Sequence, residues 1–149
     1  MSVKEQLQKA LTQAMRRQDT LRKRVLRLAL SAIKLAEVEK GHPLTDTEAW
    51  AVLQKEVKAR HETIEGAEQA GRQDLIDEAR AEITVLEEFL PTPLTPEELE
   101  ALAREVIAEV GAASPKDMGK VMKPLLAKVQ GRASGSEVSQ VVRRLLAEG

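Results

Sequence analysis

The chain has 149 residues, of which 42% are hydrophobic and 32% are charged, and its formal net charge is −1. It contains no cysteine, no tyrosine and only one phenylalanine and one tryptophan, which excludes disulfides, thiolate metal sites and cysteine nucleophiles and argues against a protein that stacks single-stranded bases. The core must be built from aliphatic side chains, which favours packed helices over sheets.

Two helices are predicted in the first 40 residues. The first covers residues 3–17, and its apolar face consists of Val3, Leu7, Ala10, Leu11 and Ala14. Asp19 is a suitable N-cap for the second helix, which extends to about Glu39 and is ended by Gly41. The predicted buried stripe of this second helix consists of Leu21, Val25, Leu28, Ala32 and Leu35. Lys23, Arg27 and Lys34 lie together on the opposite side, because steps of four and seven residues return to nearly the same angle.

Two more helices are predicted before residue 90. Thr45 and Glu48 have the spacing of a capping box, and the third helix continues from there to about Ala70. Its predicted buried face consists of Trp50, Leu53, Val57 and Ile64. The fourth helix covers residues 74–88, with Ile76, Ala79, Ile83 and Leu86 inside. Because the connections are short, we expect these four helices to form antiparallel hairpins.

Prolines mark the one clear boundary. Three of them lie between residues 91 and 96, where they cannot continue a helix and favour a stiff, extended segment. Thr95, Pro96 and Glu98 then supply the start of a fifth helix that ends before Gly111. Two shorter helices follow, from Ser114 to about Val129 and from Ser134 onward, and the apolar face of the last consists of Val138, Val141, Val142, Leu145 and Leu146.

The sequence therefore predicts an all-α protein in three parts. These are an N-terminal domain of about four helices over residues 1–90, a Pro-rich linker over residues 91–95 and a small three-helix domain over residues 96–149. No run approaches the ~20 apolar residues of a membrane span, and the N-terminus has no apolar signal segment, so we expect a cytoplasmic protein.

Residues that would carry catalysis or bind a metal are not evident. Neither histidine has carboxylates at metal-ligand spacing, and His61, between Val57 and Ile64, is expected to be partly buried. No glycine-rich phosphate loop is present, and adjacent carboxylates such as Glu87 and Glu88 do not share a helix face. We expect no cofactor, no metal and no catalysis by the chain alone.

The charges are unevenly distributed. Residues 1–35 carry nine basic and two acidic side chains, residues 36–110 carry seven and nineteen, and residues 111–149 carry seven and three. Either the basic ends neutralise the acidic middle across helix contacts, or one basic surface is left free for a polyanion, and both alternatives remain open at this point.

Five segments carry a family resemblance. They are GAASPKDMGKVM at residues 111–122, KVQGRASG at residues 128–135, EITVLEEFLP at residues 82–91, LQKEVK at residues 53–58 and RQDL at residues 72–75. Together they make the chain similar, over essentially its whole length, to the YqeY-like family.

That resemblance implies a fold and a set of partners. In the family a helical N-terminal domain precedes a smaller helical domain, which is shared with the tail of the B subunit of the tRNA-dependent amidotransferase. That tail helps to hold the tRNA body, while other domains and subunits transfer the amide. The family also carries the label of a carbon–nitrogen ligase with glutamine as amido-N-donor, to which the residues of this chain give no chemical support.

Basic residues of the last third are the candidate nucleic-acid ligands. The set consists of Lys116, Lys120, Lys123, Lys128, Arg132, Arg143 and Arg144. We expect phosphate contacts chiefly from Lys116, Lys120, Lys128 and Arg132, and the basic face of Lys23, Arg27 and Lys34 is a second candidate. Gly119 would let another helix or a phosphate come close, and Gly131 and Gly135 flank a turn that presents Arg132. The alternative for the 118–122 segment is simple helix packing.

The chain departs from the family pattern at three places. Lys123 and Pro124 stand where a small pair is usual, Ala127 replaces a proline, and Ser134 replaces an acidic residue. Because a proline inside a helix costs ~3 kcal/mol or more, we expect the helix to be split or kinked near Met122.

Three functions are compatible with these features. The first is an accessory module that binds tRNA or structured RNA through backbone phosphates. The second is a protein-interaction module whose acidic middle helices dock a basic partner, such as a synthetase or ribosomal protein. The third is a non-catalytic component of an amidotransferase assembly. The oligomeric state is left open.

Overall fold

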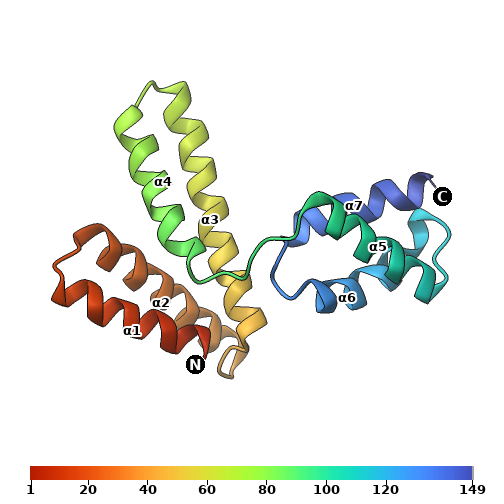
Figure 1. Ribbon diagram of the computed structural model, residues 1–149, viewed down its shortest axis with the longest axis horizontal. Helices are drawn as coiled ribbons and strands as arrows, with labels where there is room; N and C mark the ends of the chain where they lie inside the picture. The colour runs from red at the N-terminus through yellow and green to blue at the C-terminus, as the bar shows by residue number, and fades with distance from the viewer. Residues whose placement is uncertain (149) are drawn as a thin grey trace. The chain divides into compact units, whose positions relative to one another are not determined.

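The protein is all-α, as predicted. The computed structural model describes residues 1–148, and this part of the chain contains seven α-helices, one 3-10 turn and no strand. The elements are α1 (Val3–Arg16), α2 (Thr20–Lys40), α3 (Asp46–Gln69), α4 (Gln73–Glu87), α5 (Pro96–Val110), η1 (Pro115–Asp117), α6 (Met118–Val129) and α7 (Gly135–Glu148). They form two compact units, one ending at Leu90 with α1–α4 and one beginning at Pro91 with α5–α7 (Figure 1).

The predicted helix starts are confirmed in atomic detail. The Asp19 carboxylate accepts a hydrogen bond from the backbone N–H of Arg22 at 3.1 Å. Thr45 and Thr95 each form a complete capping box, with Glu48 and Glu98 respectively. These side chains satisfy backbone N–H groups that the first helical turn leaves without partners.

The N-terminal unit has an aliphatic core. Helix α1 packs along α2, α3 packs along α4, and α2 also contacts α3 and α4 (Figure 1). Leu7, Leu26, Leu53 and Leu86, one from each helix, are completely buried. Trp50 packs at the edge of this core and is partly buried. A second cluster joins α3 to α4 and consists of Ile64, Ala67, Ile76, Ala79 and Ile83.

The predicted buried stripe of α2 is confirmed at Leu21 and Val25 but is wrong at Leu28 and Leu35. Its buried residues are Val25, Leu26, Ala29 and Ile33. Leu28 and Leu35, which were expected inside, are 49% and 60% exposed. Helix α2 has apolar residues on two sides, so periodicity alone does not decide which side meets α1, α3 and α4. The prediction for His61 is also wrong, because this side chain is exposed on α3.

The C-terminal unit has a separate core. It is formed by α5, α6 and α7, and its completely buried side chains are Ala103, Val106, Val121, Leu125, Val138 and Val142. The helix was expected to be split or kinked near Met122; the split is wrong, because α6 continues as one helix through Pro124. Burial of Val121 and Leu125 on either side of the proline offsets the missing backbone hydrogen bond. The helix geometry changes instead at Met118, after the 3-10 turn.

Candidate nucleic-acid interface

The basic candidates of the C-terminal unit divide into paired and unpaired side chains, and Lys128 is the most strongly paired. Its Nζ donates to Glu105 Oε1 and to Glu109 Oε1, each at 3.1 Å. The hydrogen bonds to Glu109 and Glu105 raise the pKa of Lys128 above its ordinary value. The salt bridges of Lys128 therefore link α6 to α5 and hold its ammonium group against the two carboxylates.

Arg132 is held by the segment that precedes α5. Its Nε donates to the carbonyl oxygen of Thr92 at 2.8 Å, and its own carbonyl accepts the backbone N–H of Leu94 at 2.8 Å. A guanidinium nitrogen also lies 3.8 Å from the Glu98 carboxylate. Gly131, which precedes it, has a φ of +77°, a left-handed conformation that favours glycine. The predicted turn thus exists, and it places the Arg132 guanidinium against the backbone of Thr92, with the side chain still 39% exposed.

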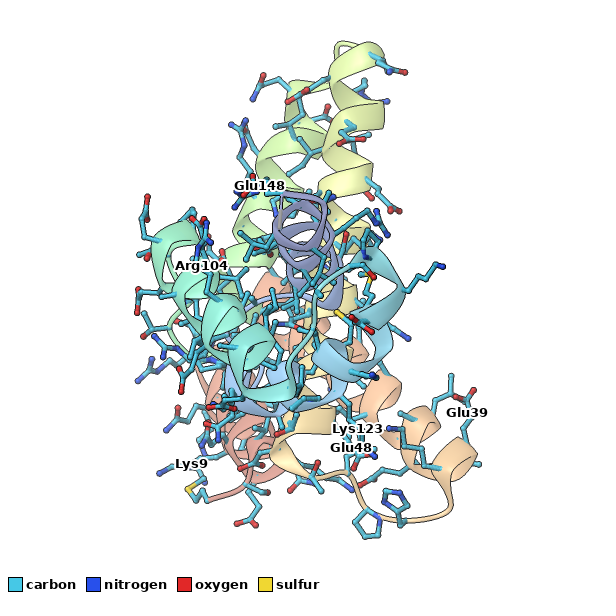
Figure 2. All side chains as sticks on the ribbon, turned by 90° about the vertical axis from the view of Figure 1, so that its right-hand side faces the viewer. Lys9, Glu39, Glu48, Arg104, Lys123 and Glu148 are labelled. Carbon is cyan, nitrogen blue, oxygen red and sulfur yellow. The ribbon has the colours of Figure 1, made fainter. Side chains whose placement is uncertain are left out.

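Arg144 also has acidic neighbours. Its guanidinium lies 3.3 Å from the carboxylate of Glu148 and 3.6 Å from that of Glu100. Arg104 reaches the same two carboxylates, at 4.0 Å and 2.8 Å respectively; Arg104 and Glu148 are labelled in Figure 2. The charges of two arginines and two glutamates thus neutralise one another between α5 and α7.

Three lysines remain largely free, and we call Lys116, Lys120 and Lys123 the lysine ridge. Lys116 and Lys123 have no salt bridge to any residue of the described chain, and Lys120 has only a long one, to Asp117 at 3.7 Å. Lys123 is labelled in Figure 2. The side chain of Lys120 is 71% exposed. Lys120 and Lys123, three residues apart, lie on the same face of α6, and Lys116 lies on η1 just before that helix. Arg143 on α7 is likewise exposed, with no salt bridge within residues 1–148.

The surface next to the lysine ridge is open and mostly positive. A Cβ added at Gly119 would meet no atom within 4 Å, so no helix approaches there and the packing alternative does not hold for this glycine. It does hold for Val121, which is buried, and for Met118 and Met122, which pack on the core. Asp117 is the carboxylate that lies near Lys120. A hydrogen bond from the backbone N–H of Ala113 is the main reason that the pKa of Asp117 is lowered, so it stays ionised at neutral pH.

The second candidate face also consists of cations that no described carboxylate pairs. Arg27 and Lys34 are exposed and Lys23 is half-buried, and none of them forms a salt bridge within the described residues. The same is true of three exposed cations that were not singled out, Lys9, Arg16 and Arg17. The excess of basic residues in positions 1–35 was their only signal.

Metal-ligand geometry is not found in residues 1–148, where no group of three or more histidine or carboxylate side chains is placed to hold an ion. A shallow hollow of about 630 Å³ lies in the N-terminal unit, lined by side chains of α1 and α2 and by Gly41, His42 and Pro43 after α2. None of the described helices has the length and apolar character needed to cross a bilayer.

Comparison with known proteins identifies relatives over nearly the whole chain. The family model described as Yqey-like protein matches residues 4–146. The relative named Altered inheritance of mitochondria protein 41, mitochondrial, from Lachancea thermotolerans, is 29% identical over 145 residues, which cover 93% of this chain and 78% of the relative.

Proposed function

Since the chain belongs to the YqeY-like family, we propose that it is an accessory protein without catalysis of its own that binds tRNA or another structured RNA through backbone phosphates. The lysine ridge is the observation that carries this proposal. Lys120 and Lys123 lie on one face of α6 and Lys116 lies on η1 just before it, next to open space at Gly119, and the one salt bridge of this group in the described residues is from Lys120 to Asp117.

The chemistry of the ridge suits phosphates rather than bases. A lysine ammonium is a compact charge on a flexible stem, so a row of lysines follows a phosphate backbone without reading sequence. The C-terminal unit contains no aromatic residue on which a base could stack. We therefore assign the main phosphate contacts to the lysine ridge, with Arg143 as a further candidate. We expect weaker phosphate contacts from Lys128, Arg132 and Arg144, because their charged groups are already bonded to carboxylates or to a backbone carbonyl.

The salt dependence of tRNA binding tests this assignment. Phosphate contacts release condensed counterions, so three contacts give a slope of log K against log salt of about −2 to −3, at ~0.7 to 0.9 per contact. Changing Lys116, Lys120 or Lys123 to Ala should weaken binding of unfractionated tRNA and flatten the slope by a little under one unit each. Filter binding at a series of salt concentrations measures both quantities.

Matched variants separate this surface from others. Lys128→Ala, in the same helix but with its charge already paired, should have a smaller effect than Lys123→Ala. If the combined change of Lys23, Arg27 and Lys34 to Ala abolishes binding while the ridge variants do not, the phosphate site lies on the N-terminal unit. Absence of tRNA binding at low salt would remove the RNA function altogether.

A protein-interaction module is the second candidate, and exposed acids on α3 favour it. Glu62, Glu65 and Glu68 form no salt bridge within the described residues and give this helix an acidic surface for a basic partner, such as a synthetase or an amidotransferase. A complex that resists nuclease and is lost when these three glutamates are changed to Gln would favour this function over RNA binding.

A further inference from the structure

Helix α2 exposes an apolar seam. Leu28, Leu35 and Val38 are 49%, 60% and 71% exposed, and they make up three of the seven large apolar side chains that the described chain leaves in solvent. With Ser31 they follow one another at steps of three, four and three residues, which is the spacing of a helix–helix seam. We call Leu28, Ser31, Leu35 and Val38 the α2 strip. It faces away from Leu26, Ala29 and Ile33, which meet the core.

Unpaired cations border one side of the α2 strip. Arg27 and Lys34 each precede a leucine of the strip and are themselves seven residues apart, so both lie along the same edge of the seam. Neither forms a salt bridge within the described residues. Arg22 and Arg24 of the same helix, by contrast, pair with Glu88 and Glu78. Within the described residues, the two cations beside the α2 strip therefore lack acidic partners, whereas two other arginines of the same helix have them.

The strip ends at the hollow described above. Lys34 and Val38 line it together with Leu30 and Pro43, so apolar surface continues past the last turn of α2. Its one acid, Glu37, is already paired with Lys4 at 2.8 Å. A bulky apolar side chain of an incoming helix finds space there with a lysine beside it.

We propose that the α2 strip docks an amphipathic helix of a partner protein, with an apolar seam flanked by acidic residues. Such a helix covers the leucines and at the same time pairs with Arg27 and Lys34. The phosphates of an RNA could pair with the two cations, but RNA would leave the apolar side chains of the strip exposed to water. An amphipathic helix therefore fits this surface better than RNA does.

A second copy of the chain fits less well. Two α2 helices in antiparallel pairing bring Arg27 and Lys34 of one copy against the same cations of the other. Parallel pairing offers one complementary contact, between Lys34 and Glu39, and leaves Arg27 opposite Ala32. The strip also extends along only about 15 Å of helix, at 1.5 Å per residue, which is short for the ~800 Å² per partner of a stable dimer. The surface therefore suits a single docked helix.

Two synthetic peptides test the proposal on the full chain. Both have three heptads with leucine in the seam; one has glutamate at the flanking positions and the other has lysine, and like charges keep each peptide from pairing with itself. In fluorescence anisotropy the glutamate peptide should bind at least about tenfold more tightly than the lysine peptide. Leu28→Gln with Leu35→Gln should weaken that binding by about tenfold or more.

Two further variants complete the design. Leu75→Gln on α4, a matched change of an exposed leucine in the same unit, should have no effect. Arg27→Glu with Lys34→Glu should reverse the preference, so that the lysine peptide binds better. All of these positions are exposed, and circular dichroism should show an unchanged helical signal.

The alternatives give distinct results. Equal binding of the two peptides, no binding, or binding that is insensitive to the leucine changes overturns the proposal. Displacement of the bound peptide by tRNA would assign the surface to RNA. A dimer of the full chain in sedimentation that is abolished by Leu28→Gln and Leu35→Gln would assign it to a second copy.

Discussion

The Arg132 guanidinium joins the turn before α7 to the segment before α5, because its Nε donates to the carbonyl oxygen of Thr92. We predict that Arg132→Ala lowers the melting temperature of the C-terminal unit by about 4 to 8 °C, the shift expected for the loss of roughly 1 kcal/mol in a domain of this size. Lys123→Ala, which removes an exposed cation of the same unit that has no salt bridge in the described residues, should leave the melting temperature unchanged. Thermal melts followed by circular dichroism measure both. If Arg132→Ala melts like the parent protein but loses tRNA binding, Arg132 is a ligand and not a structural residue.

The sequence predicts which basic residues the C-terminal unit contains, but it does not predict which of them form salt bridges. The cations of the last third are evident from the sequence, and so is the turn at Gly131. The pairing of Lys128 is not, because Glu105 and Glu109 lie some 20 residues earlier on α5. Whether a side chain of α6 meets them depends on how α5 and α6 are rotated against each other, which the interdigitation of whole apolar faces decides.

At the scale of elements, the first turn of α3 carries a pH-sensitive contact. Hydrogen bonds from Lys40 and from the backbone N–H of Thr45 lower the pKa of Glu48 from 4.5 to about 2. Because the folded pKa is below the unfolded one, the ionised group stabilises the fold above about pH 4.5, and this contribution is lost as the pH falls toward 2. We predict that Glu48→Gln melts below the parent protein at pH 7 and that the difference shrinks between pH 4.5 and pH 2. A difference that is constant over this range would contradict the assignment.

Helix boundaries followed from the sequence far better than helix faces did. Asp19, Thr45 and Thr95 act locally, through side chains that accept a hydrogen bond from the backbone N–H three residues later, so their effect is encoded in a short segment. The orientation of α2 is a property of the assembled unit. This helix has two apolar sides, and only one of them can pack on the core. The other side, with Leu28 and Leu35, is exposed to solvent.

For the whole molecule, the separate core of α5–α7 leads to a prediction about independence. Residues 91–149, expressed alone, should be soluble and helical, because they contain their own buried cluster, the Thr95 cap and the Arg132–Thr92 contact. Circular dichroism of the fragment measures this. If it is unfolded while the full chain is folded, the two units depend on each other for stability.

The placement of Trp50 gives the protein a built-in optical label. This tryptophan packs against the core of the N-terminal unit, and the C-terminal unit has no aromatic side chain at all. Intrinsic fluorescence excited at the indole band therefore follows the unfolding of α1–α4 alone, while far-ultraviolet dichroism sums over every helix. A single denaturant titration of the unmodified chain, recorded with both signals, distinguishes one cooperative transition from two.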